Sequence, residues 1–249
     1  SGCVNSILFS DDGNHIYTGS DDTRIKIFEL STGRTVSTIS TIHTNNIFYA
    51  KDLPFSDGEK LVSCAADGRV VSTGVSNGTG REIHKHIGRA HRLSLFPGCP
   101  NEFFSCGEDG KCHLFDLRLP DCHVLHFSFC NNESDLCAIY GISINPLHSY
   151  EVLLGGASPH AQIFDTRRQI YPIGVYSPSH FSSLNSIEPH ITGLTFNYSG
   201  QQFVATYNDE HVYTFSRYNH IKEMPQISTI SPMSTDDPSS IPTSSSTSS

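Results

Sequence analysis

Tryptophan is absent from this chain of 249 residues, and methionine occurs only twice. A repeated aromatic position can therefore be filled only by phenylalanine or tyrosine. Apolar runs are short: none approaches the ~18 residues of a membrane-spanning helix, and the N-terminus lacks the basic-then-apolar pattern of a signal peptide. We therefore expect no membrane partner.

Basic residues are also scarce, since 16 Lys and Arg stand against 25 Asp and Glu for a formal net charge of −9. Non-specific nucleic-acid binding depends on neutralising phosphates with Lys and Arg. An acidic chain without a basic run is a poor candidate for that role. We expect no direct binding of nucleic acid.

The eight cysteines do not predict disulfides, because a globular chain of this length does not need them and no secretory signal is present. We expect them to be reduced, in a cytoplasmic or nuclear protein. One group lies close in sequence: Cys122, His126, Cys130 and Cys137. Its Cys-x3-His-x3-Cys spacing matches no familiar zinc site. We predict no metal site and no cofactor.

An eleven-residue pattern recurs five times, at starts 42 to 51 residues apart. Each copy has a tight polar turn, usually with an acidic residue at its fourth position, followed by a short strand that ends on an aromatic. The copies are GSDDTRIKIFE from Gly19, CAADGRVVSTG from Cys64, CGEDGKCHLFD from Cys106, GGASPHAQIFD from Gly155 and TYNDEHVYTFS from Thr206. A period in the forties with four short strands per unit is typical of a propeller.

The repeats predict an all-β fold in which residues 1–222 form propeller blades. Gly can take positive φ in the turns between the first and second strands, at Asp12-Gly13, Asp57-Gly58 and Ser199-Gly200. The expected repeats cover about 2–41, 42–82, 83–130, 131–178 and 187–222. From Pro225 on, 18 of 25 residues are Ser, Thr or Pro, so residues 223–249 are expected to form a disordered tail.

These features resemble the WD-repeat family from Val4 to Phe215, with Phe in most of the places that hold Trp in the family. The resemblance implies a structural tetrad in which a His before the first strand pairs with the turn Asp and a Ser or Thr of the second strand. Two repeats match this set: His43, Ser63 and Asp67 in repeat two, and His86, Ser105 and Asp109 in repeat three.

The other repeats keep only part of the set: Thr18 and Asp22 in repeat one, Leu154 and Ser158 in repeat four, and His190, Ala205 and Asp209 in repeat five. Ser, His and Asp together also make a hydrolase triad. Here the set recurs at the repeat period, and no G-x-S-x-G elbow, Walker loop or H-E-x-x-H motif is present. We expect no enzyme and no catalytic residue.

Repeats three and four end in the same phrase, Phe-Asp-x-Arg, at residues 115–118 and 164–167. Asp and Arg at i and i+2 of a strand project to one face, so Asp116 with Arg118, and Asp165 with Arg167, are expected to pair. Two such arginines would form a small basic patch that suits acidic or carbonyl groups of a partner. The alternative is that each Arg forms only a salt bridge within its blade.

The doubled phrase resembles the W-D-x-R motif of WD-repeat substrate receptors for cullin-4 RING ubiquitin ligases. The stretches GCVNSILFS, IFYAKDLP, FFSCGEDG and YNDEHVYTF are similar to the branch that contains cullin-4-associated factors 6 and 8 and the WD and tetratricopeptide-repeat proteins. The resemblance implies a non-catalytic receptor whose partners are the ligase's adaptor protein and a protein substrate. Arg118 and Arg167, oriented by Asp116 and Asp165, would bind the adaptor.

Such receptors usually close a ring of about seven blades, so we expect these five repeats to form an incomplete part of one. An alternative function is a general protein-binding module in chromatin, transcription or trafficking, without a ligase link. It would use the opposite rim, where the candidate contact residues are Asp21, Asp22, Arg24, His43, Asn45 and Asn46.

Overall fold

The computed structural model describes residues 2–129, 136–168, 171–183 and 189–219. The tail expected over residues 223–249, Cys130 and the side chain of His126 lie outside the described residues. The part of the chain that the structure describes holds no helix with the length and apolar character that crossing a bilayer requires.

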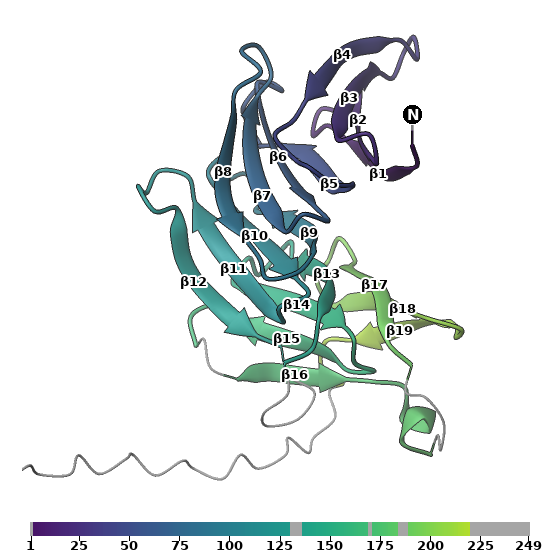
Figure 1. Cartoon of the computed structure of the whole chain (residues 1–249). Coiled ribbons are helices and arrows are strands. Elements are labelled where there is room, and N and C mark those ends of the chain that lie inside the picture. Colours follow the sequence, from purple (N-terminus) through teal and green to yellow (C-terminus); the bar gives the residue numbers. More distant parts are fainter. Residues whose placement is uncertain (1, 130–135, 169–170, 184–188, 220–249) are drawn as a thin grey trace, which may run out of the picture.

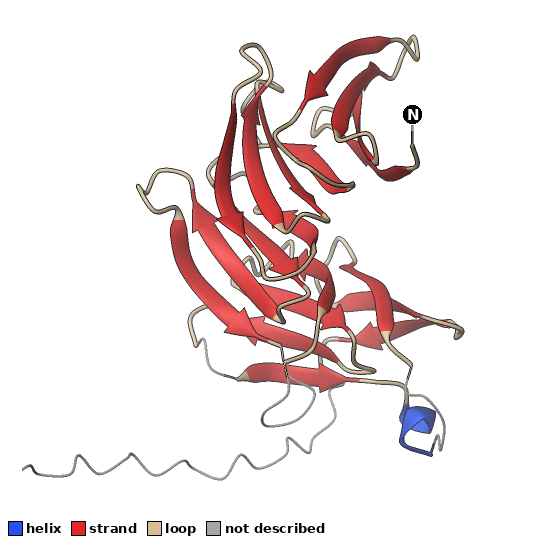
Figure 2. Cartoon of the chain, viewed as in Figure 1, coloured by secondary structure: helices blue, strands red, loops and turns tan. Residues whose placement is uncertain are grey.

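Five antiparallel sheets, numbered here 1 to 5 in chain order, make up almost all of the described structure (Figure 2). Sheets 1 and 2 contain β1 (Val4–Phe9), β2 (His15–Ser20), β3 (Arg24–Glu29) and β4 (Thr35–Ser40), then β5 (Ile47–Asp52), β6 (Lys60–Ala65), β7 (Arg69–Gly74) and β8 (Gly80–Lys85). Sheet 3 contains β9 (Ala90–Leu95), β10 (Glu102–Gly107), β11 (Lys111–Asp116) and β12 (His123–Ser128).

Sheet 4 contains β13 (Ile139–Ile144), β14 (Glu151–Gly156), β15 (Ala161–Asp165) and β16 (Pro172–Tyr176). The described part of sheet 5 has three strands, β17 (Ile191–Phe196), β18 (Gln202–Tyr207) and β19 (Val212–Ser216), and a short 3-10 helix, η1 (Ser179–Ser183), precedes it. In every sheet, strands that are consecutive in sequence are also neighbours in space. This arrangement confirms the all-β propeller expected from the repeats.

The sheets follow one another in an arc, with sheets 1 and 5 at its two ends (Figure 1). The first strand of each sheet lies on the inner side of the arc, where residues of β1, β5, β9, β13 and β17 line one hollow of about 490 Å³. Consecutive sheets pack against each other through these inner strands. The five repeats therefore share one axis, and equivalent residues of neighbouring sheets lie at the same end.

Apolar side chains are buried between consecutive sheets. Ile25 of sheet 1 packs in one cluster with Ile47 of sheet 2, and Val62 of sheet 2 packs in another with Phe115 of sheet 3. Similar clusters join sheet 3 to sheet 4 and sheet 4 to sheet 5. Burial of each such side chain contributes about 1.5–3 kcal/mol, so the interfaces between sheets hold the arc together.

One expected boundary is wrong. The sequence predicts the division between the second and third repeats after about residue 82, but β8 runs on to Lys85. The strand reads GREIHK, and its side chains are half-buried or exposed. The strand therefore carries little apolar signal of its own, and the boundary moves to the residue after Lys85.

The tetrads of the second and third sheets form as expected. His43 Nδ1 lies 3.3 Å from Asp67 Oδ1, and His43 Nε2 lies 2.9 Å from Ser63 Oγ. In sheet 3 the corresponding distances from His86 are 3.0 Å to Asp109 and 2.7 Å to Ser105. All these contacts satisfy polar groups in or beside the turn between the second and third strands, which supports a structural role.

Close backbone approach explains the glycine in one of these turns. Gly68 has φ +80°, and a Cβ there would lie 2.5 Å from the carbonyl oxygen of Gly88. The amide of His86 also donates to the Gly68 carbonyl oxygen over 2.9 Å. The loop that supplies the histidine of sheet 3 is therefore bound to the turn of sheet 2 as well.

Sheets 4 and 5 hold only part of the tetrad, and other side chains bind the turn between their second and third strands. Ser158, which replaces the turn Asp in sheet 4, accepts the His160 amide over 3.1 Å, and Leu154 is fully buried. In sheet 5 the turn is bound through Asn208, whose side chain accepts the His190 amide over 2.6 Å. This contact uses the His190 backbone, whereas the tetrads of sheets 2 and 3 use the histidine ring.

We predict that Ser63→Ala lowers the free energy of unfolding by about 1–3 kcal/mol, because it leaves buried His43 without its hydroxyl partner. Urea denaturation would measure the change. Ser40→Ala, at an exposed position of β4, is the matched control and should have little effect. Equal stabilities of the two variants would contradict a structural role for the tetrad.

The tetrad of sheet 2 also predicts a loss of stability at acidic pH. Burial alone would raise the pKa of Asp67, but the amides of Thr44 and Arg69 and the His43 ring outweigh it, and the pKa lies below 3.8. The stabilisation from this carboxylate is complete above about pH 4 and is lost as the pH falls through the lower folded-state value. Unfolding curves should therefore depend less on pH between 5 and 2 in Asp67→Asn than in wild type. If the free energy of unfolding changed with pH as steeply in Asp67→Asn as in wild type, the stabilising role of the Asp67 carboxylate would be contradicted.

Candidate functional site

Two arginines leave neighbouring sheets at the same end. Asp116 ends β11 and pairs across the sheet with Glu102, while Asp165 ends β15 and pairs with Glu151. The arginine follows two residues later in each sheet. We call this end of the arc, where the first strand turns into the second and the third into the fourth, the fork rim. The opposite end, which carries Asp67 and Asp109, is the tetrad rim.

Arg118 forms a two-pronged ion pair with Asp116. Its Nε lies 2.8 Å from Asp116 Oδ1 and its Nη2 lies 2.7 Å from Oδ2. The same carboxylate accepts the Arg118 backbone amide over 2.9 Å, which fixes the turn as Asp side chains commonly do. Glu102 Oε1 contacts Nη2 at 2.7 Å. Asp116 therefore fixes both the backbone conformation and the side-chain orientation of Arg118.

Arg167 forms the same fork with Asp165, at 2.9 Å from Nε to Oδ1 and 2.7 Å from Nη2 to Oδ2. Its backbone amide again donates to the carboxylate, over 2.9 Å. The second support differs, because the guanidinium lies 3.6 Å above the Tyr150 ring in a cation–π contact. The expected pairing of Asp and Arg is confirmed in both repeats.

The forks combine a buried carboxylate with an exposed guanidinium. Asp116 and Asp165 are buried, and the side-chain hydrogen bond from the neighbouring arginine is the main reason that the pKa of each lies below its ordinary value. The arginine side chains remain 59% and 61% exposed. A guanidinium carries five N–H donors, and the fork engages those on Nε and Nη2. Each arginine is thus oriented by its own sheet and remains accessible to a partner.

Exposed apolar side chains lie at the same rim as the forks. Leu119 lies in the turn beside Arg118, while Leu147, Tyr171 and Tyr198 lie in the turns of sheets 4 and 5 at the same rim. Tyr198 is 91% exposed. Arginine and aromatic residues are enriched at protein interfaces, so the fork rim has the composition of a binding surface.

Glu151 shows why the two forks differ. Its position in sheet 4 matches that of Glu102, but its carboxylate is occupied by Arg217 of the neighbouring sheet 5, with Nε 2.6 Å from Oε2 and Nη2 bound to Oε1. The Asn145 side chain donates to the same carboxylate over 2.9 Å. Sequence reasoning missed Glu102, Tyr150 and this inter-sheet pair, because cross-strand and inter-sheet neighbours leave no local sequence signal.

The alternative surface on the tetrad rim is partly occupied by internal contacts. His43 is buried within its tetrad, so it is not an accessible contact residue. Asp21 accepts the Cys3 amide and the Asn5 side chain, and Asp22 accepts the Arg24 amide over 3.2 Å. Asn45 remains exposed, and Asn46 is half-buried. Of the six candidate residues on this rim, Arg24 and Asn45 are exposed.

Cys122 and Cys137, the described cysteines of the group that is close in sequence, lie at different interfaces. Cys122 is buried between sheets 2 and 3, whereas Cys137 packs at the interface of sheets 3 and 4. Cys64 and Cys106 are fully buried, as expected for small apolar residues. The seven described cysteines form no disulfide.

Residues 1–29 match the family described as WD domain, G-beta repeat. The chain is a WD-repeat protein. Human DDB1- and CUL4-associated factor 6 is 30% identical over 237 residues, which cover 86% of this chain and 27% of that protein. The mouse protein of the same name is 29% identical over a similar stretch. Human WD and tetratricopeptide repeats protein 1 is 30% identical over 175 residues, which cover 67% of this chain and 25% of that protein.

These comparisons confirm the resemblance stated from the sequence. The WD repeats make this chain a protein-interaction module, and they point to a scaffold without catalysis. The chain spans about a quarter of the length of these relatives.

Truncation of two arginines of this WD-repeat protein should lower its stability by different amounts. We predict that Arg217→Ala lowers the free energy of unfolding by about 3 kcal/mol, because Glu151 is 2% exposed and loses its counter-charge. Arg167→Ala should lower stability less, since that guanidinium is 61% exposed and buried Asp165 keeps the Arg167 backbone amide as a partner. Chemical denaturation of both variants would measure the difference. A larger loss in Arg167→Ala would contradict the division between structural and accessible arginines.

Proposed function

We propose that this chain is the adaptor-docking part of a substrate receptor for a cullin-4 RING ubiquitin ligase, and that its fork rim binds the adaptor DDB1. The observation that carries the proposal is the pair of oriented, exposed arginines, Arg118 and Arg167, at equivalent positions of neighbouring sheets. Factor 6, whose name associates it with DDB1 and CUL4, is similar to the chain across both forks.

The forks suit a docking role for a physical reason. Asp116 and Asp165 restrict the arginine side chains before binding, which reduces the conformational entropy lost on association. The exposed leucine and tyrosine side chains nearby supply apolar area that charged groups alone lack. An adaptor surface that presents carboxylates or backbone carbonyls around an apolar pocket would complement this arrangement.

The receptor acts by proximity. A chain bound to the adaptor at one surface and to a target protein at another raises the local concentration of that target near the ubiquitin carrier. The tetrad rim and the central hollow lie away from the forks and leave room for a target. No bond-making step by this chain is required.

The proposal predicts that Arg118→Ala with Arg167→Ala weakens binding of the purified chain to purified DDB1 by about 30-fold or more, since a central interface arginine commonly has at least this effect. Isothermal titration calorimetry would measure the affinities. The matched control is Arg24→Ala with Arg89→Ala, which removes two exposed arginines from the tetrad rim. It should bind like wild type.

Circular dichroism of both double variants would verify folding. Equal binding of DDB1 by the fork variant and by wild type would overturn the site. Failure of the wild-type chain to bind DDB1 would overturn the ligase role and favour a general interaction module.

A further inference from the structure

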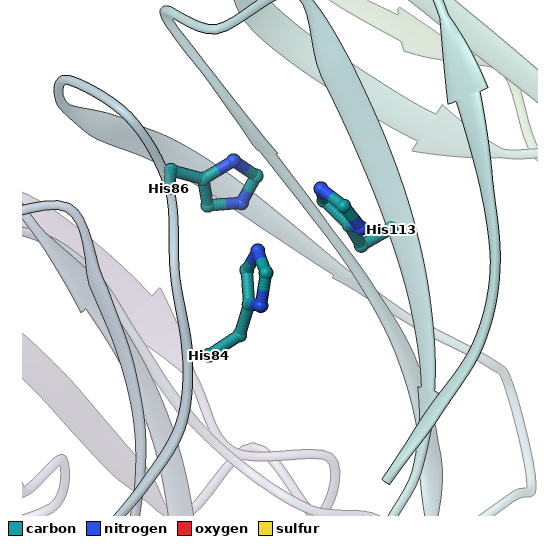
Figure 3. A group of neighbouring side chains, drawn as sticks. All are labelled: His84, His86 and His113. Carbon is teal, nitrogen blue, oxygen red and sulfur yellow. The ribbon is translucent and has the colours of Figure 1, made fainter. Parts of the chain in front are cut away.

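Three histidines meet at the tetrad rim, between sheets 2 and 3. His84 comes from β8, His86 from the loop that follows it, and His113 from β11; Figure 3 shows their rings turned toward one another. Each ring offers one nitrogen, and the three nitrogens lie within 4.8 Å of one another. His86 and His113 are buried and His84 is half-buried, so the cluster opens to solvent on the side of His84.

Two of the rings are held by further partners. His86 Nδ1 lies 3.0 Å from the Asp109 carboxylate, and His113 Nδ1 lies 2.9 Å from His123 Nε2. A metal-binding histidine usually has its second nitrogen engaged in this way, which fixes the ring and its tautomer. Because Ser105 pairs with His113 across β10 and β11, the His86 nitrogen bound to Ser105 faces the strand that carries His113.

The tetrad itself does not require this concentration of histidines. In the tetrad of sheet 2, Thr41 stands two residues before His43, and Val71 pairs with Ser63 across the strands. His84 and His113 occupy the same two positions in sheet 3. The tetrad of sheet 2 forms without an imidazole at either position, so the structural role of the tetrad leaves His84 and His113 unexplained.

We propose that His84, His86 and His113 bind a divalent transition-metal ion, with Zn²⁺ as the first candidate. Neutral imidazole nitrogens suit zinc, copper and nickel, and three histidines with one solvent ligand are an established zinc arrangement. Tetrahedral coordination at a Zn–N distance of about 2.0–2.1 Å requires nitrogens about 3.3 Å apart. Half-buried His84 can supply the closing movement by side-chain rotation.

Metal bound at the inner nitrogen of His86 would replace its contact with Ser105, while Asp109 would keep Nδ1. Burial, followed by the neighbouring histidines, lowers the pKa of His84 to about 4 and that of His113 to about 3. The ion would link β8 of sheet 2 to β11 of sheet 3 and so join two blades.

The test uses the full chain, freed of metal with a chelator and titrated with ZnCl2 by calorimetry. The variants His84→Thr and His113→Val introduce the residues found at the equivalent positions of sheet 2. His211→Ala, which removes an exposed histidine next to sheet 5, is the control. The inference predicts one Zn²⁺ per wild-type chain, binding at least about tenfold weaker in either cluster variant, and no change in the control.

Cobalt provides a second readout, because Co²⁺ bound by three histidines absorbs visible light according to its coordination geometry. Wild type and His211→Ala should give the same spectrum with Co²⁺, and His84→Thr should not. His84 is half-buried and takes no part in the tetrad, so this variant tests the site even if His113→Val fails to fold. Zinc affinity in His84→Thr equal to that of wild type, or no zinc binding by wild type, would overturn the inference.

Discussion

Each of these sheets is a single layer, so its apolar side chains can be buried only against the next sheet. Val62 and Phe115 belong to one cluster although they come from different repeats, and the tetrad loop at His86 contacts the turns of both sheets 2 and 3. This packing keeps neighbouring repeats in the same orientation about one axis. Arg118 and Arg167, at the same position of their repeats, therefore reach the same rim.

The local features of the site could be predicted from the sequence, because they depend on residues close along the chain. The spacing of Asp116 and Arg118 predicts the fork, and the geometry confirms it. The supports could not be predicted: Glu102 assists Arg118, whereas its counterpart Glu151 is bound by Arg217 of the next sheet. That choice depends on packing between sheets, which leaves no pattern within one repeat.

The histidine cluster illustrates the same limit. The sequence draws attention to Cys122, His126, Cys130 and Cys137 because they are close along the chain, yet Cys122 and Cys137 belong to different core clusters. His84 and His113 are separated by most of a repeat and meet only because β8 lies beside sheet 3. The error at the end of β8 has a related origin, since a strand with little apolar alternation carries a weak boundary signal.

The two rims thus differ in chemistry, with oriented arginines at one and buried histidine networks at the other. Amide hydrogen exchange of the chain, with and without DDB1, tests the assignment of the fork rim most directly, because it locates the contact without any substitution. The docking proposal predicts slower exchange over residues 116–119 and 165–168, and unchanged exchange over the tetrad turns at 67–69 and 109–111. Protection confined to the tetrad turns, or absent from both rims, would contradict it.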